Sequence, residues 1–310
     1  MQFGVHLPVV DLDGAPRTLD RLSTYARRAA ALDFRFLCAN DHLVFRRPWL
    51  DGPTALAAVL GASGSMTIAT TVALPVIRGP AQTATMLAAL ETLSGGRLLA
   101  GVGPGSSAGD YRAAGVPFAE RWSRFDEAVR TLRGLLGGHR DGFRGTFDAT
   151  DDGEPEPRPP GSAGPPLWIA SWGSEAGLRR VAELGDGWLA SAYNTTPPEF
   201  GRALDRLAAA GKPATTFPHA IATMWFYVTE APRAADRVVE EILAPLLDRS
   251  PEAVRALGLP IGSAEHCAER IDAYVGAGAQ RIFIWPVADE LHQLEIFREN
   301  VVPRIAGAHS

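Results

Sequence analysis

Residues 67–102 read TIATTVALPVIRGPAQTATMLAALETLSGGRLLAGV and contain one complete unit of the predicted fold. Thr67–Leu74 is rich in β-branched residues, which favours a strand. Pro80–Leu93 carries alanines and leucines at helical spacing and begins with proline, which the first turn of a helix tolerates. Two glycines end this helix, and Leu98–Val102 follows as another short apolar strand. The stretch therefore predicts strand, helix and strand in succession.

The same alternation continues along the whole chain. Strands are expected at Phe3–Val9, Phe36–Ala39, Thr67–Leu74, Leu98–Val102, Leu167–Ala170, Trp188–Ala190, Ile221–Thr229 and Ile282–Val287. Helices are expected at Arg17–Leu32, Pro53–Ser63, Pro80–Leu93, Ala119–Leu136, Ser174–Leu184, Pro197–Ala210, Arg233–Leu247, Ser263–Val275 and Glu290–Ile305. This pattern predicts an α/β chain whose parallel sheet closes into a (β/α)8 TIM barrel. An open doubly wound sheet is the rival, but it would usually bring a glycine-rich turn after the first strand, and residues 7–11 (LPVVD) are not one.

One segment interrupts the alternation. Asp151–Pro166 contains six prolines and three glycines in 16 residues, which excludes a helix or a central strand. A linker between two domains is one interpretation. An irregular insertion before the fifth strand is the better one, because strands and helices resume directly after it. We therefore expect one domain over residues 1–310.

Composition excludes several classes of protein. The chain of 310 residues is 46% hydrophobic with a formal charge of −5, which is ordinary for a globular protein and argues against a nucleic-acid partner. It lacks the pattern of a signal peptide and any apolar run long enough to span a membrane. Cys38 and Cys267 are too few for a disulfide framework. We expect a cytoplasmic protein that does not associate with membranes.

In such a barrel the active site lies at the carboxyl ends of the strands. Asp41 and His42 follow the second strand, and an imidazole can exchange a proton near neutral pH while a neighbouring carboxylate orients it. A polar pair that only ties a loop together is the alternative. His6 ends the first strand, where a core histidine satisfied by a backbone group is the favoured interpretation and a functional residue is the alternative.

Two turns at these strand ends are candidates for ligand binding. Ser171-Trp172-Gly173-Ser174 opens a helix, so its backbone amides and hydroxyls would suit an anion, although Ser174 is also compatible with a simple helix cap. Residues 103–107 (GPGSS) form a second turn where a ligand could approach the backbone. The seven histidines show no His-x-His or His-x-x-x-His spacing, so no metal site is predicted.

A series of motifs resembles the bacterial luciferase-like oxidoreductases. They are, in chain order, Asn40–Leu43 (NDHL), Thr71–Pro75 (TVALP), Leu93–Gly103 (LSGGRLLAGVG), Gly115–Phe118 (GVPF), Glu120–Trp122 (ERW), Phe125–Glu127 (FDE), Pro166–Ala170 (PLWIA) and Leu184–Trp188 (LGDGW). The resemblance covers roughly residues 3 to 305. No single motif is specific, but the ordered series is.

The resemblance implies a TIM barrel, often a homodimer, that binds reduced flavin mononucleotide (FMN) or the deazaflavin coenzyme F-420 at the strand ends. The cis peptide bond found in the third strand of deazaflavin-dependent relatives would correspond to Thr71–Val72. The catalytic residue would be His42, and the substrate would contact His6, Trp49 and Trp285. The cofactor would contact Asp41, Thr71, Val72, Gly103, Gly105, Ser106, Ser171, Trp172, Gly173 and Ser174.

Two observations bear on substrate and cofactor. Relatives that oxidise sugar phosphates carry a catalytic glutamate where this chain has Ser106, so that substrate class is disfavoured. Lys212 is the only lysine among 30 basic residues, a bias typical of GC-rich genomes in which the deazaflavin is common. We therefore expect hydride transfer between F-420 and a small organic substrate. A monooxygenase using reduced FMN is the alternative.

Overall fold

Eight strands in the computed structural model pair in parallel and close into a barrel. The structure describes residues 1–137, 143–150 and 164–306. The barrel strands follow one another in chain order: β1 (Gln2–His6), β2 (Phe36–Ala39), β3 (Thr67–Ala73), β4 (Leu98–Val102), β7 (Leu167–Ala170), β8 (Gly187–Ser191), β9 (His219–Val228) and β11 (Arg281–Pro286). Pairing of β11 with both β9 and β1 closes the ring. The predicted (β/α)8 barrel is confirmed.

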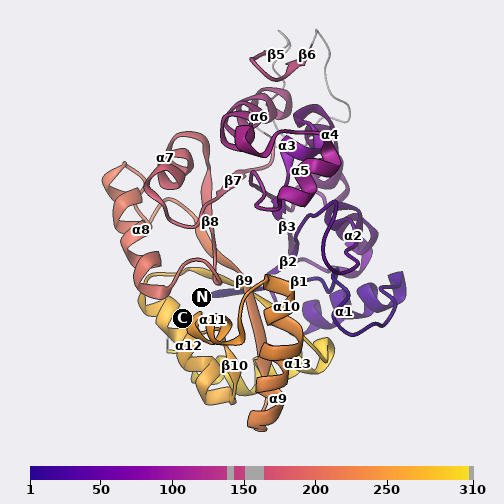
Figure 1. The fold of residues 1–310 in the computed structure, drawn as a ribbon, viewed down its shortest axis with the longest axis vertical. Helices are drawn as coiled ribbons and strands as arrows, with labels where there is room; N and C mark the ends of the chain where they lie inside the picture. Colours follow the sequence, from indigo (N-terminus) through magenta and orange to yellow (C-terminus); the bar gives the residue numbers. More distant parts are fainter. Residues whose placement is uncertain (138–142, 151–163, 307–310) are drawn as a thin grey trace.

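Helices surround the strands as an outer ring (Figure 1). The main ones are α1 (Leu19–Ala31), α2 (Gly52–Ala58), α4 (Pro80–Leu93), α6 (Arg121–Leu136), α7 (Glu175–Leu184), α8 (Pro197–Ala209), α12 (Ala264–Gly276) and α13 (Glu290–Ile296). Polar side chains cap several of their first turns, as Thr18 does for α1 and Ser263 for α12. Their apolar faces pack on the outer side of the strands, which leaves the carboxyl ends of the strands to the loops.

Shorter elements interrupt this scheme. They are α3 (Pro75–Arg78), α5 (Ala108–Ala114), α9 (Pro232–Arg237), α10 (Ala244–Leu247), α11 (Pro251–Ala256), the strand β10 (Ile261–Gly262), the 3-10 turns η1 (Leu60–Ala62), η2 (Phe118–Glu120) and η5 (Val302–Arg304), and the π-helical turns η3 (Val238–Leu243) and η4 (Phe297–Val301). The helix predicted over Arg233–Leu247 is thus divided into α9, η3 and α10. Pro245 follows the π-helical turn, and its missing N–H cannot continue a regular helix.

A small hairpin precedes the proline-rich segment. It joins β5 (Phe143–Arg144) to β6 (Ala149–Thr150). The Glu127 carboxylate on α6 accepts hydrogen bonds of 2.7–2.8 Å from the backbone amides of residues 146–148 and so holds the hairpin to the helix. Of the insertion predicted at Asp151–Pro166, residues 151–163 lie outside the described residues.

Packed side chains fill the interior of the barrel. They are Phe36, Cys38, Ala69, Leu99, Trp168, Leu189, Ala220, Ala222 and Phe283. Gly4 belongs to the same layer, because a Cβ there would lie 2.6 Å from the Phe283 ring and 2.7 Å from Cβ of Phe36. The interior is therefore a core, and a ligand must bind above it.

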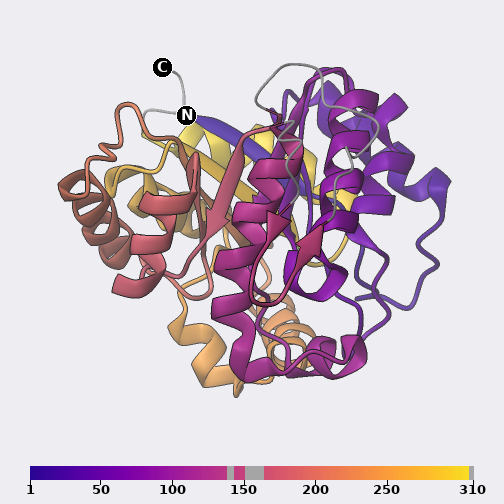
Figure 2. The same ribbon diagram turned by 90° about the horizontal axis from the view of Figure 1, so that it is seen from above.

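The segment between β9 and α12 reaches the end of the barrel opposite the chain's N-terminus, where the carboxyl ends of the strands lie (Figure 2). It contacts two loops of that end. Asp248 forms an ion pair with Arg46 in the loop after β2, and Arg249 donates to Oδ1 of Asn194 after β8 at 3.1 Å. The residues from α9 to α11 therefore help to build the mouth of the barrel.

Candidate active site

One layer of side chains lies directly above the core. Side chains alternate along a strand, so residues two positions beyond core residues also point inward. His6, Asn40, Thr71, Ser191 and Trp285 stand in this relation to Gly4, Cys38, Ala69, Leu189 and Phe283. With Trp225 of β9, these residues are called the mouth layer below.

Trp225 joins the mouth layer because β9 is irregular. The register between β9 and β11 shifts between Ile282 and Ile284, and Thr223 has a positive φ of 53°. The extra residue places Trp225, rather than Met224, opposite Trp285 on the inner side. No pattern in the sequence signals this bulge, so Trp225 is not among the predicted site residues.

His6 is the centre of a buried chain of hydrogen bonds. Its Nε2 accepts the Thr223 N–H at 3.1 Å, so the proton of the neutral ring is on Nδ1, which lies 3.4 Å from Oγ1 of Thr71. The Thr71 hydroxyl donates in turn to Oδ1 of Asn40 at 3.0 Å. Burial lowers the pKa of His6 to about 3, although a side-chain hydrogen bond to Asn40 acts in the opposite direction. His6 is therefore a neutral structural histidine, with a backbone group as one partner.

An aromatic wall continues from His6. Trp285 stacks between His6 and Trp225, with ring centroids 4.5 and 4.3 Å apart, and receives the edge of Trp49 at 5.7 Å. The indole N–H groups of Trp225 and Trp285 are buried and have no hydrogen-bond partner among the described residues. Because buried polar groups are normally satisfied, these two donors are candidates for contact with a ligand.

His42 lies at the edge of this wall. Its ring packs against Phe45 and Trp49, with centroids 4.6 and 4.7 Å away, and 18% of the side chain is exposed. Its Nδ1 is 2.8 Å from Oδ2 of Asp110 on α5. Asp110 was not identified from the sequence, because it lies 68 residues from His42 and within no recognised motif.

Asp41, the neighbour of His42 in the sequence, has a different partner. Both of its oxygens accept hydrogen bonds of 2.6 Å from Arg78, and these bonds keep the pKa of Arg78 above its usual value. Arg78 also binds Asp51, the residue that caps α2. Asp41 therefore ties the end of β2 to α2 and α3, and it does not orient His42 as the sequence suggested.

The end of β3 lies against β4. The Thr71–Val72 peptide bond is cis, as the resemblance implied. A Cβ at Gly103 would lie 2.8 Å from Cγ2 of Val72, so the glycine makes room for that side chain. In the turn that follows, Gly105 has a φ of +77° and Ser106 precedes Ser107, which caps α5. Val72 and Gly103 therefore lie against each other, and Gly105 and Ser106 lie in the turn that follows β4.

The Ser171–Ser174 turn connects β7 to α7. The Ser171 hydroxyl accepts the Gly173 N–H, and the Ser174 hydroxyl accepts the Gly177 N–H, both at 3.2 Å. Ser174 is thus the helix cap. The first amides of α7, at residues 174–176, have no partner in the described part of the chain. Trp172 is 54% exposed, and its carbonyl oxygen accepts the Thr195 hydroxyl at 3.1 Å.

Two further buried polar atoms, Oγ of Ser191 at the end of β8 and Nδ2 of Asn194 after it, have no partner among the described residues. Among all the residues that the structure describes, no group of three or more His, Cys, Asp or Glu side chains is arranged to hold a metal ion. None of the described helices combines the length and apolar character needed to cross a bilayer.

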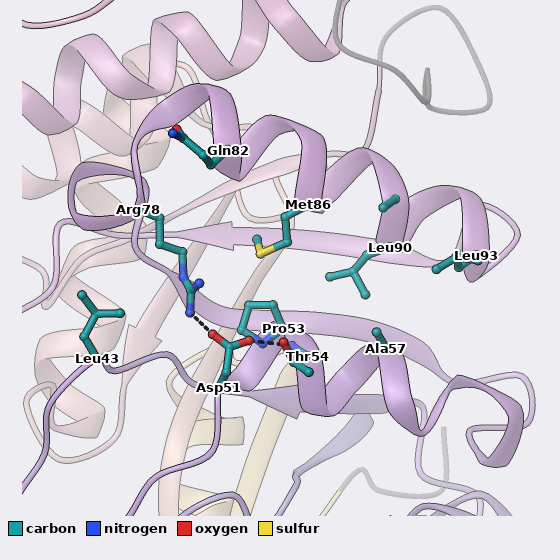
Figure 3. Close-up of a pocket in the computed structure, with 11 residues that line it drawn as sticks. Leu43, Asp51, Pro53, Thr54, Ala57, Arg78, Gln82, Met86, Leu90 and Leu93 are labelled. Carbon is teal, nitrogen blue, oxygen red and sulfur yellow. Dashed lines mark hydrogen bonds and ion pairs between the residues drawn. The ribbon is translucent and has the colours of Figure 1, made fainter. Parts of the chain in front are cut away.

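A separate groove lies on the outer side of the barrel, between α2 and α4 (Figure 3). Its walls are mainly apolar and include Met86, Leu90 and Leu93, while Arg78 and Asp51 form its polar end. None of the mouth-layer residues lines this groove, which is therefore distinct from the candidate active site.

Comparison with known proteins agrees with this architecture. A family model described as luciferase-like monooxygenase matches residues 1–281. The F420-dependent hydroxymycolic acid dehydrogenase of Mycobacterium tuberculosis (strain ATCC 25618 / H37Rv) is 27% identical over 323 aligned positions, which cover 92% of this chain and 84% of that protein.

Two solved structures share the fold. An F420-dependent secondary alcohol dehydrogenase in complex with an F420–acetone adduct superposes with a TM-score of 0.83 and 19% identity over 98% of both chains. The oxygenating constituent of 3,6-diketocamphane monooxygenase from Pseudomonas putida, in complex with FMN, gives a TM-score of 0.76 and 17% identity over 98% of this chain and 99% of that one. Because the family model spans most of the chain, this protein belongs to the luciferase-like monooxygenase family and is an oxidoreductase.

Proposed function

We propose that this protein transfers a hydride between coenzyme F-420 and a small organic substrate at the mouth of the barrel. The observation that carries the proposal is the state of His42. Its Nδ1 is bonded to a buried carboxylate, whereas its Nε2 has no partner among the described residues and lies beside an uncharged aromatic wall. Interconversion of an alcohol and a ketone requires a proton to move at the substrate oxygen, and His42 would exchange that proton.

The residues at the mouth fit a flavin-like cofactor. Oγ of Ser191 and Nδ2 of Asn194 are buried and have no partner in the ranges that the structure describes, as expected of groups that a ligand satisfies. The free amides at the start of α7, near the exposed Trp172, would suit the cofactor's phosphate. When bound, the deazaflavin supplies or accepts the hydride.

Each predicted site residue keeps a proposed role. Asp41 would act indirectly, because its bonds to Arg78 fix the strand end that carries His42. One side of the cofactor's deazaflavin ring would rest on Val72 and Gly103. The substrate would lie against Trp49 and Trp285. The remaining proposed cofactor contacts are Thr71, Gly105, Ser106, Ser171, Trp172, Gly173 and Ser174, and His6 would support the substrate wall from below.

The names of two similar proteins support this class of reaction. The mycobacterial relative is described as an F420-dependent hydroxymycolic acid dehydrogenase, and one structural neighbour as an F420-dependent secondary alcohol dehydrogenase. Both names describe oxidation of a hydroxyl group. We therefore propose a neutral secondary alcohol or ketone as the substrate, consistent with the uncharged wall of Trp225, Trp285 and Trp49.

Titration with both cofactors tests the proposal. Purified protein is titrated separately with F-420 and with FMN, and binding is followed by quenching of tryptophan fluorescence. We expect F-420 to bind at least about tenfold more tightly, a difference of about 1.4 kcal/mol. Tighter binding of FMN, with no response to F-420, would contradict the proposal.

A monooxygenase that uses reduced FMN is the second candidate. It is favoured by the shared fold of an FMN-bound Baeyer–Villiger monooxygenase component. Oxygen consumption with reduced FMN and a panel of cyclic ketones distinguishes the two functions. Substrate-dependent consumption would establish the monooxygenase, and its absence, together with F-420 binding, supports the dehydrogenase.

We also propose that residues 1–310 form one domain that pairs as a homodimer. The apolar groove between α2 and α4 is the proposed contact face, because Leu93 at its end is 67% exposed and Leu43 is 45% exposed. Light scattering after gel filtration should give twice the chain mass for the natural protein. Leu93→Arg should shift the mass towards one chain, and an unchanged dimer would exclude this face.

A further inference from the structure

Asp110 gathers three hydrogen-bond donors around one buried carboxylate. Its Oδ1 accepts the backbone N–H groups of Leu43 and Val44 at 3.1 and 2.8 Å, and its Oδ2 lies 2.8 Å from Nδ1 of His42. The side chain of Asp110 is 1% exposed. The carboxylate thus fixes both the loop after β2 and the ring that this loop carries.

The position of Asp110 is itself well defined. It lies in the first turn of α5, where its N–H donates to Oγ of the capping residue Ser107 at 3.3 Å. The short helix follows directly from the turn after β4. The Asp110 carboxylate, in the loop region after β4, therefore holds the His42 imidazole, in the loop after β2, and only β3 lies between these two strands.

This contact decides which nitrogen of His42 carries the proton. An ionised carboxylate only accepts hydrogen bonds, so Nδ1 must be the protonated nitrogen of the neutral ring. Nε2 then has a free lone pair, and it is the nitrogen without a partner among the described residues. Asp41 cannot serve in this way, because both of its oxygens bind Arg78.

We propose that Asp110 is the positioning residue of His42, holding its Nδ1–H tautomer so that Nε2 is presented to the substrate as a proton acceptor. The proton step rests on the proposed function. In the oxidative direction the substrate O–H bond breaks, its proton bonds to Nε2, and the electron pair of the C–H bond leaves as hydride to the deazaflavin. The imidazolium that results is paired with the Asp110 carboxylate. In the reductive direction the same proton returns to the carbonyl oxygen.

Asp110→Asn tests this assignment. The Asn carbonyl oxygen can still accept the amides of Leu43 and Val44, while its NH2 group replaces Oδ2 and donates to Nδ1. The variant should therefore keep the loop but force His42 into the Nε2–H tautomer. In a well-characterised hydrolase, the equivalent Asp→Asn change preserves geometry and slows catalysis about 10⁴-fold through the wrong tautomer.

The tautomer is read directly by NMR of protein labelled with ¹⁵N-histidine. The His42 signals are assigned by their loss in His42→Gln. We expect a protonated Nδ1 in the neutral ring of the natural protein and a protonated Nε2 in Asp110→Asn. The control is Asp126→Asn, which removes a carboxylate that binds Arg180 on the outer helices and should leave the His42 signals unchanged.

The outcomes are distinct. A protonated Nε2 in the neutral ring of the natural protein overturns the proposal, and this measurement does not depend on whether any variant folds. An unchanged tautomer in Asp110→Asn overturns it as well.

With F-420 and 2-propanol as the test alcohol, Asp110→Asn should lower kcat at least about 100-fold with KM changed less than about threefold. A flipped tautomer with normal kcat would remove the proton-transfer role. F-420 binding is measured separately. Because it does not depend on the His42 tautomer, a failure to bind F-420 would contradict the proposed function without contradicting the role of Asp110.

Discussion

The indole rings of Trp225 and Trp285 stack 4.3 Å apart in the mouth of the barrel. Simple alternation along β9 would place Met224, two residues after the inward Ala222, on the inner side. The irregularity at Thr223 moves Trp225 inward instead. The backbone N–H of Thr223 also donates a hydrogen bond to Nε2 of His6. One bulge therefore builds the aromatic wall and fixes the neutral histidine behind it.

The unused indole N–H of Trp225 predicts an asymmetry between two tryptophans. Trp225→Phe keeps most of the stacked ring and removes a donor that has no partner in the described part of the chain. Trp188→Phe removes a donor that bonds to the Ser171 carbonyl oxygen at 3.0 Å and leaves that oxygen buried. The second change should cost about 1–3 kcal/mol more in free energy of unfolding, measured with urea. Equal losses would mean that Trp225 has a protein partner.

The buried His6 predicts a loss of stability in acid. Its pKa in the folded state is lowered to about 3 from 6.5, so between these pH values the unfolded chain binds a proton that the folded chain does not. The free energy of unfolding should therefore fall as the pH falls below 6.5, by up to about 1.4 kcal/mol per pH unit. At pH 5 this contribution is about 2 kcal/mol.

His6→Gln isolates this effect. The Gln oxygen can still accept the Thr223 N–H, but the side chain does not titrate. Burial lowers the pKa of His219 too, and that contribution is common to both proteins. Urea unfolding at pH 7 and pH 5 should show a smaller decrease for the variant. The same decrease in both proteins would show that His6 is not the acid-sensitive group.

His42 is predicted to act in the chemical step more than in cofactor binding. General acid–base groups contribute about 10²–10⁴-fold in rate, whereas a hydrogen bond contributes about 0.5–1.5 kcal/mol to binding. His42→Ala should lower turnover at least about 100-fold and change F-420 affinity less than about tenfold. His42→Asn, which cannot exchange a proton, should be nearly as slow. Normal turnover with lost cofactor binding would make His42 a binding residue.

Gly173 is predicted to matter for cofactor affinity through its backbone. Its φ is +92°, and a Cβ there would meet only Ala203 and Thr195, at the ordinary distances of 3.7 and 4.0 Å. Gly173→Val should therefore rearrange the turn without a clash, because β-branched residues avoid this φ. Because this rearrangement displaces the first amides of α7, F-420 binding should weaken at least about tenfold, a loss of about 1.4 kcal/mol in binding free energy.

Gly95→Val is the matched control for this change. Gly95 has a φ of +68°, and no atom lies within 4 Å of an added Cβ. It follows α4, away from the Ser171–Ser174 turn. The two variants should lose comparable stability, but only Gly173→Val should lose cofactor affinity. Equal affinities in the two variants would remove the turn from the cofactor site.

The barrel was predictable from the sequence because its elements are specified locally. The predicted bounds of Phe36–Ala39, Pro80–Leu93, Leu98–Val102 and Leu167–Ala170 are those of β2, α4, β4 and β7. Each is marked by apolar periodicity and by glycine or proline at its ends, which act within a few residues. The order of strands around the ring then follows from parallel pairing of consecutive units.

The location of the candidate site could also be predicted from the sequence. Strand ends can be counted along the chain, and a parallel barrel brings all of its carboxyl ends to one face. This placed His42, Trp285 and the Ser171–Ser174 turn at the mouth without knowledge of any contact between them.

The partners of these residues were decided only by the tertiary structure. Asp41 is adjacent to His42 in the chain, but successive residues face different directions, and its carboxylate meets Arg78 while Asp110 meets His42 across 68 residues. Trp225 faces inward only because of an irregularity in β9 that leaves no mark in composition or periodicity. Such contacts depend on how loops from distant strands pack together, and that packing is set by the shape of the closed barrel rather than by any local pattern.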